Sequence, residues 1–391
     1  MKQGFRLTHI TTVPMSLVFL RGQVRYMQSR GVEVHAISSP GDELKPFEAA
    51  EGATTAAVDM PRTISPLADL RAVWAIRREL RRVRPDLVHA QTPKGGLLGT
   101  MAATLAGVPC RIYHIRGLPF MTATGRRRML LKSTEKIACR LAHRVLCVSP
   151  SLREVAIAEG LCPPEKIAVL AGGSGNGVDA DGRFNPASLE AGTRESVRQS
   201  WGVGPEELVI GFVGRLVRDK GIVELAEAFA SLRAELPNVH LVVVGPREAR
   251  DAVPEHVLRE LERGERVHLL GSDWETPRLY AGMDVVALPT YREGFPNVPL
   301  EAAAMERPVV ATRIPGCVDA VADGETGTLV PAQDAGALAD ALRTYLVDPE
   351  LRRRHGLAGR ERVLRAFRQE VIWEALHAEY LRLLNQSTGK N

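Results

Sequence analysis

The chain alternates short apolar runs of strand length with longer stretches whose apolar residues recur at helical spacing. This alternation is typical of parallel sheets whose faces are covered by helices, so the first half predicts an α/β domain. The predicted strands of this half are residues 5–12, 32–38, 86–90, 110–115, 144–148 and 167–171. The predicted helices are residues 18–30, 67–84, 94–106, 126–143 and 150–160.

The same rhythm restarts near residue 208 and predicts a second α/β domain, so that the chain has two Rossmann-like domains. The polar loop 172–206 separates the two runs, and we place the domains at residues 1–195 and 196–366. The segment 367–391 begins with a long amphipathic helix, which we expect to cross back and pack toward the first domain. The predicted strands of the second domain are residues 208–213, 239–244, 267–270, 285–288, 308–311 and 327–330.

The composition is that of an ordinary globular protein, with 45% hydrophobic and 25% charged residues. The longest apolar runs are far shorter than the roughly 20 residues of a membrane span. The first residues lack the basic start and apolar block of a signal peptide. We therefore expect a cytoplasmic protein. The cysteines are scattered without metal-ligand spacing, as in proteins of a reducing compartment: Cys110, Cys139, Cys147, Cys162 and Cys317.

Positive charge is concentrated in the first 150 residues, which hold 23 Lys or Arg against 10 Asp or Glu. A basic half indicates anionic partners, namely a phosphorylated substrate, a nucleic acid or an anionic membrane. Residues 126–140 predict a basic amphipathic helix, and residues 77–84 add a second cationic stretch. Both fit peripheral contact with the inner face of a membrane, or merely a solvated surface. Nucleic acid is disfavoured because aromatic residues are only 5% of the chain and none interleaves with these clusters.

The most informative motif is Glu293-Gly-Phe-Pro-Asn-Val-Pro-Leu-Glu301, directly after the buried strand 285–288. Asn297 is the predicted N-cap of the helix that follows. A strand, a tight loop and a helix N-terminus form an anion site, because free N–H groups and the helix dipole favour a phosphate. Glu293 and Glu301 flank this site, where one carboxylate can face a sugar ring and the other can reach ribose hydroxyls.

A second motif, Gly211-Phe-Val-Gly214-Arg215-Leu-Val-Arg-Asp-Lys220-Gly221, follows the first strand of the second domain. Ligands of open parallel sheets bind beyond such strand ends. Gly214 allows close approach of the backbone, and Arg215 and Lys220 can offset the charge of a departing diphosphate. The alternative is a solvated turn with two exposed cations. A Walker loop is absent from the sequence.

With these two motifs in the same order and separation, the chain resembles the retaining glycosyltransferases of family 4, whose architecture is GT-B. Glu293 and Glu301 match the E-x7-E pattern of that family, and Arg215 and Lys220 match its G-R…K-G pattern. The first half is similar to the capsule and lipid-linked oligosaccharide branch. The segments that carry this second likeness are Phe19-Leu-Arg-Gly-Gln23, residues 92–99, Arg116-Gly-Leu118 and Gly175-Asn-Gly-Val-Asp179.

The resemblance implies two facing domains and a nucleotide-sugar donor, such as a UDP-sugar, held mainly by the second domain. Arg215 and Lys220 would bind the donor diphosphate, and Glu301 would hold the ribose. Glu293 would contact the donor sugar, with the backbone around Gly294 and Phe295 at the distal phosphate and Leu270 near the base. Asn297 would also be among the substrate-binding residues. The acceptor would be a glycan, and the resemblance favours a polyprenyl-diphosphate-linked one over a soluble one. Neither a metal nor another cofactor is implied.

Two features depart from the family pattern. Many members have a His before the Gly of the 116–118 motif, facing the donor sugar, whereas this chain has Arg116 there and His114 two residues earlier. Both side chains lie on one face of the predicted strand, so either can fill this role. A Gly-Gly pair is missing after the first strand, which leaves Ser16 as a candidate for phosphate or acceptor contact. Asp179-Ala-Asp181 imitates a metal motif, but its loop context indicates a turn.

The sequence leaves three alternatives to a transferase. A nucleotide-sugar epimerase shares the architecture but acts without an acceptor. A non-catalytic, membrane-associated sugar-nucleotide binder would not need both charged pairs intact. A glycosidase could use two carboxylates, but it has no use for a diphosphate site.

Overall fold

The computed structural model describes residues 4–249 and 251–388, so the ends of the predicted segments 1–195 and 367–391 lie outside the described residues. The chain divides into two compact units. Unit 1 comprises the described residues up to Asn176 together with those from Gln369 onward, and unit 2 extends from Gly177 to Arg368. Helix α15 (Gln369–Thr388) thus belongs to unit 1.

Unit 1 is built on a parallel sheet that, over the described residues, has seven strands in the order β3-β2-β1-β4-β5-β6-β7. The strand order reverses between β1 and β4, which is the place where ligands of such sheets bind. The strands are β1 (Phe5–Ile10), β2 (Val32–Ser38), β3 (Thr54–Ala57), β4 (Leu87–Gln91), β5 (Cys110–Ile115), β6 (Arg144–Cys147) and β7 (Ile167–Ala168).

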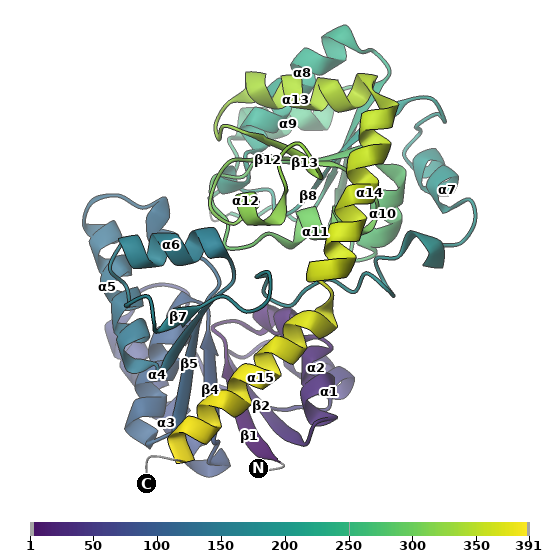
Figure 1. Cartoon of the computed structure of the whole chain (residues 1–391). Helices are drawn as coiled ribbons and strands as arrows, with labels where there is room; N and C mark the ends of the chain where they lie inside the picture. The colour runs from purple at the N-terminus through teal and green to yellow at the C-terminus, as the bar shows by residue number, and fades with distance from the viewer. Residues whose placement is uncertain (1–3, 250, 389–391) are drawn as a thin grey trace. The chain divides into compact units, whose positions relative to one another are not determined.

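Helices cover both faces of this sheet. One face packs against α1 and α15 (Figure 1). Leu376, Tyr380 and Leu383 of α15 share a core with strand residues. Helices α3 and α4 share the core on the other face, and α5 packs beside α4. The helical segments are η1 (Pro14–Leu20), α1 (Gln23–Gln28), α2 (Leu44–Glu51), α3 (Pro66–Val83), α4 (Pro93–Ala106), η2 (Pro119–Met121), α5 (Gly125–Leu141) and α6 (Pro150–Ala158).

Unit 2 contains, in its described residues, a six-stranded parallel sheet in the order β10-β9-β8-β11-β12-β13. Its central strands are apolar at nearly every position because both faces are covered. The order reverses between β8 and β11, which again marks a ligand-binding edge. The strands are β8 (Leu208–Val213), β9 (Val239–Val244), β10 (Val267–Gly271), β11 (Val285–Leu288), β12 (Val309–Thr312) and β13 (Gly327–Val330).

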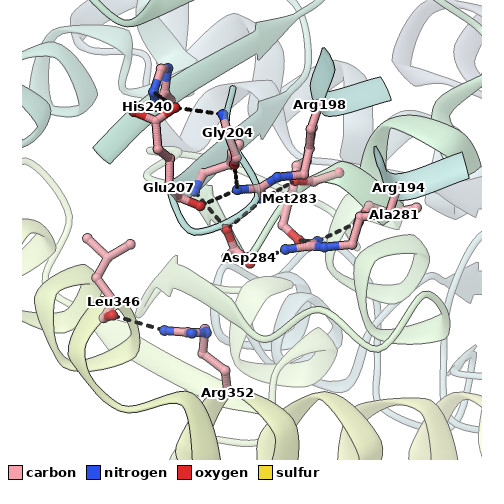
Figure 2. Close-up of polar contacts among 12 residues, drawn as sticks. Arg194, Arg198, Gly204, Glu207, His240, Ala281, Met283, Asp284, Leu346 and Arg352 are labelled. Atoms are coloured by element: carbon pink, nitrogen blue, oxygen red, sulfur yellow. Dashed lines mark hydrogen bonds and ion pairs between the residues drawn. The ribbon is translucent and has the colours of Figure 1, made fainter. Parts of the chain in front are cut away.

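The helices of unit 2 are held to the sheet by apolar cores and by one polar network. Arg194 and Arg198 of α7 (Thr193–Ser200) point toward Asp284, which accepts from them at 2.7 and 3.2 Å (Figure 2). The remaining segments are η3 (Pro186–Ser188), η4 (Arg218–Lys220), α8 (Ile222–Glu235), α9 (Glu255–Arg263), α10 (Thr276–Gly282), α11 (Asn297–Ala304), α12 (Cys317–Ala320), α13 (Ala335–Val347) and α14 (Pro349–Ala366).

The predicted α/β class and the strand alternation are confirmed, while several local features differ from the prediction. Strand β3 and helix α2 were not predicted, and the predicted helix 18–30 consists of η1 and α1. Residues 177–195 belong to unit 2 rather than to the first domain. The reason is long-range pairing with the end of unit 2, where the Val178 N–H donates to the Phe367 carbonyl at 2.8 Å.

Candidate active site

In unit 2, two loops meet at the carboxyl ends of β8 and β11. The Tyr291 N–H donates to the Asp219 carbonyl at 2.8 Å, and Arg292 pairs with the Asp219 carboxylate at 2.9 Å. Gly221 has a φ of +71°, and a Cβ there would overlap the Pro289 carbonyl oxygen. Only glycine therefore lets the two loops approach so closely.

Lys220 and Glu293 form an ion pair where these loops meet. Their side chains are only 18% and 13% exposed, so the pair is largely removed from water. A third loop supports it, because Gly316, at a φ of +85°, lies against the Gly294 carbonyl. The Lys220 ammonium has three N–H donors, so it can bind an anion while it retains Glu293.

Glu301 lies in α11, the helix that follows the loop of Glu293. The Tyr280 hydroxyl donates to Glu301 Oε2 at 3.0 Å, and burial raises the pKa of this carboxyl. The predicted N-cap Asn297 is wrong, since Asn297 is the first helical residue and Pro296 holds the cap position. Pro296 has extended backbone and no side-chain acceptor, so it cannot satisfy the first amides of α11.

Other predicted residues lie around this pair without joining it. Arg215 is 53% exposed and pairs with Glu248 at 2.9 Å, whereas Lys220 contacts Glu293 directly. Phe295 is buried against the ring of Phe367, with 5.5 Å between the ring centroids. Two further residues of the predicted site lie in or beside the strands of unit 2. Gly214 directly follows β8, and Leu270 lies in the edge strand β10.

Cys317 is buried next to this site. Burial, and then the negative charge of Glu293, raise the pKa of its thiol well above the ordinary value. The thiol therefore stays protonated at neutral pH and is a poor nucleophile.

In unit 1, Arg116 follows β5 at the carboxyl edge of the sheet. Its Nε donates to Gln91 Oε1 at 2.6 Å, and its Nη2 donates to the Gly175 carbonyl at 3.3 Å. The guanidinium lies 4.9 Å from the ring centroid of Phe19. Burial lowers the pKa of Arg116 to about 10, so it remains a cation at neutral pH.

His114 is 7% exposed and belongs to a polar network under α15. Its Nδ1 lies 3.1 Å from His89 Nε2, and His89 Nδ1 lies 2.6 Å from the Tyr380 hydroxyl. Burial, followed by the charge of Arg116, lowers the pKa of His114 well below its usual value. The ring of His114 is therefore neutral and enclosed. Ser16 lies in η1, where its N–H donates to the Val13 carbonyl at 3.0 Å.

Matches to known protein families and relatives cover nearly the whole chain. Residues 193–362 match the family described as Glycosyl transferases group 1, and residues 17–173 match the Glycosyl transferase 4-like domain. The chain is 34% identical to the capsular polysaccharide biosynthesis glycosyltransferase CapM of Staphylococcus aureus, over 98% of this chain and 99% of that protein. The chain belongs to the family 4 glycosyltransferases, in the branch of capsule and lipid-linked glycan enzymes. It is a hexosyltransferase.

Two further relatives extend the comparison of this family 4 glycosyltransferase. The UDP-Gal:alpha-D-GlcNAc-diphosphoundecaprenol alpha-1,3-galactosyltransferase of Escherichia coli is 28% identical, over 72% of this chain and 71% of that protein. The structure of HepE of Anabaena in complex with UDP and glucose has a TM-score of 0.80 at 20% identity. It covers 97% of this chain and 99% of that chain, and this likeness confirms the predicted GT-B fold.

The structure thus joins some of the predicted site residues of the glycosyltransferase and leaves others separate. It brings Lys220 to Glu293, and it places Tyr280 under Glu301. Sequence reasoning missed Tyr280, which lies in no recognisable motif. It also missed the loop-bridging role of Asp219, which lies in the 211–221 motif but whose partner Arg292 is 73 residues away. Within residues 4–249 and 251–388, no group of three His, Cys, Asp or Glu side chains could hold a metal ion. None of the helices described is both long and apolar enough to cross a membrane.

Proposed function

We propose that this glycosyltransferase moves a hexose from a UDP-sugar to a polyprenyl-diphosphate-linked glycan, with retention of the anomeric configuration. The observation that carries this proposal is the enclosed Lys220–Glu293 pair at the reversal of strand order in unit 2. Lys220 would bind the donor diphosphate, and Glu293 would contact the donor sugar. The first amides of α11 would add neutral donors to the distal phosphate.

Arg215 would join the diphosphate by leaving Glu248. Their side chains are 53% and 28% exposed, and ion pairs at the surface contribute only about 0–1 kcal/mol. A diphosphate carries more negative charge than a single carboxylate and offers oxygens to both arms of the guanidinium, so exchange of Glu248 for a phosphate oxygen would be favourable. Tyr280 engages Glu301 Oε2, and Oε1 would accept from the ribose hydroxyls.

Transfer on this site would rest on positioning and charge stabilisation. Cys317 is protonated, and Glu293 is held by Lys220, so neither side chain is set up as an attacking group. The acceptor hydroxyl would attack from the face that the diphosphate leaves, and the departing phosphate would take its proton. Lys220 and Arg215 would offset the charge that grows on that phosphate.

A lipid-linked acceptor is supported by two exposed helix faces of unit 1. Helix α5 presents basic and apolar side chains without an exposed acid. Helix α3 presents a stripe of Leu67, Leu70 and Trp74, which are 75%, 54% and 52% exposed. Each cation near an anionic bilayer contributes roughly 1 kcal/mol, and the apolar side chains can enter the headgroup region. The exposed side chains of α5 are those of Arg126, Arg127, Met129, Leu130, Ser133, Lys136, Ile137 and Arg140.

The test is transfer with UDP-glucose, UDP-galactose and UDP-N-acetylglucosamine, each with a short-chain prenyl-diphosphate N-acetylglucosamine as acceptor. We expect one donor to give a product whose new linkage has the configuration of the donor by NMR. Inversion, or no transfer from any UDP-sugar, would contradict the proposal. A parallel reaction without acceptor separates an epimerase, which interconverts UDP-sugars alone.

Membrane contact is tested by co-sedimentation with vesicles of phosphatidylglycerol and of phosphatidylcholine. We expect binding to the anionic vesicles only, and a loss of about tenfold or more when Arg126 and Lys136 are both replaced by Glu. A matched exchange of Arg30, on another exposed segment of unit 1, should leave binding nearly unchanged. If the wild type, the double variant and the Arg30 variant bind the anionic vesicles equally, α5 is not the membrane contact.

A further inference from the structure

Three segments of unit 1 that are distant in sequence come together around Arg116. The guanidinium lies over the ring of Phe19, and Nη2 donates to the Gly175 carbonyl. The neighbouring Asn176 donates to the Arg21 carbonyl at 3.1 Å and accepts from Trp373 Nε1 at 2.7 Å. The segments 19–23, 116–118 and 175–176 therefore build one site at the carboxyl edge of the sheet, with α15 behind it.

The charge of Arg116 has no counter-ion in this site. Within the described part of the chain, Arg116 makes no ion pair, and its partners are the neutral Gln91, Gly175 and Phe19. The nearby histidines cannot act as counter-ions, because an imidazole is either neutral or cationic, and burial keeps His9 and His114 neutral. A partly buried cation without an anion is costly, and a ligand anion would remove that cost.

The surrounding hydrogen bonds hold the guanidinium in one orientation. Arg116 Nε–H donates to Gln91 Oε1, so the Gln91 amide must present its NH2 group to His9 Nδ1, 2.9 Å away. A Cβ at position 175 would overlap Arg116 Nη1, so glycine leaves the space that this nitrogen occupies. A guanidinium fixed by neutral groups is preorganised for the oxygens of a phosphate.

We infer that Arg116 is the anion anchor for the acceptor, binding the diphosphate that links its glycan to the lipid. This inference rests on the proposed function and gives Arg116 a role apart from the donor site of unit 2. The nucleotide donor also carries a diphosphate that could bind Arg116. The two possible ligands predict different losses of affinity when Arg116 is replaced.

The test is calorimetric titration of the full-length protein with farnesyl diphosphate and, separately, with UDP. In Arg116→Met we expect the Kd for farnesyl diphosphate to rise about 10- to 100-fold, as loss of a hydrogen bond to a charged group does. We expect the Kd for UDP to change less than about threefold. Arg30→Met is the matched control, since Arg30 also stacks on a ring, that of Tyr26, but is exposed.

Gly175→Ala and Arg116→Lys separate a binding role from a structural one. Gly175→Ala keeps the charge but displaces the guanidinium, so it should weaken farnesyl diphosphate as Arg116→Met does. Arg116→Lys should recover only part of the affinity, because an ammonium lacks the planar fork. If the variants melt at the wild-type temperature and bind farnesyl diphosphate normally, the inference is wrong.

Two other results would also overturn the inference. One is the absence of farnesyl diphosphate binding by the wild-type protein, and the other is an equal loss of UDP binding in Arg116→Met, which would assign Arg116 to the donor. Binding of farnesyl diphosphate does not require transfer. A failure of the proposed transferase reaction therefore remains distinguishable from a failure of this site.

Discussion

Removal of one partner of the Lys220–Glu293 pair should reduce both the stability of unit 2 and the rate of transfer. The pair is more than four-fifths enclosed, so Lys220→Met leaves a carboxylate without its counter-ion. Breaking a buried ion pair costs about 3–5 kcal/mol, and the residual exposure of this pair places the cost nearer 2–3 kcal/mol. For a domain of 150–250 residues, each kcal/mol shifts Tm by about 2–4 °C, so Tm should fall by about 4–12 °C.

The double variant Lys220→Met/Glu293→Gln isolates the interaction. With both charges removed, most of the lost stability should return, as a coupling of about 1–3 kcal/mol between neighbouring sites. Transfer should not return, because loss of a charge-stabilising group lowers kcat by roughly 10²–10³. Arg215→Met is the matched comparison: its pair with Glu248 is exposed, so activity should fall while Tm changes by less than about 4 °C.

Differential scanning fluorimetry and initial rates of transfer measure these two effects on the same samples. A Lys220→Met variant as stable as the wild type would refute the assignment of an enclosed pair. A double variant that transfers at a normal rate would remove both residues from the mechanism.

Three further predictions concern single side chains. Glu301→Gln should raise the Kd for UDP about tenfold or more, because a charged acceptor for the ribose is lost, and titration calorimetry measures this. Burial lowers the pKa of His9 from 6.5 to about 3, so stability present above pH 6.5 should be lost as pH falls toward 3. His9→Asn should flatten that acid limb in urea unfolding. Burial raises the pKa of Glu135 from 4.5 to about 7, so stability should be lost as pH rises through this range. Glu135→Gln should then be more stable than the wild type at pH 8 by chemical denaturation, and equal or lower stability would contradict this.

The sequence predicted most of the fold because strong apolar runs alternate with amphipathic stretches throughout the chain. Strand β3 was missed because Thr54–Ala57 is short and lacks large apolar residues. The predicted N-cap Asn297 is wrong by one position. Pro296, whose backbone is extended, occupies the cap, and Asn297 is the first helical residue. Local patterns place element boundaries only approximately.

The motifs identified the loops of the candidate site, but they could not predict which side chains meet. Lys220 and Glu293 are 73 residues apart, and their pairing depends on the close approach of two loops. The same limit applies to Arg116, whose partners Gln91 and Gly175 come from other strands and loops. The ion pair between Arg215 and Glu248, 33 residues apart, is likewise absent from any local pattern.

The central claim is tested most directly by a crystal structure of the protein with UDP. We predict the diphosphate on Lys220, with Arg215 turned from Glu248 toward it, and the ribose hydroxyls on Glu301. UDP bound away from these residues, or a Lys220–Glu293 pair that excludes the diphosphate, would contradict the account.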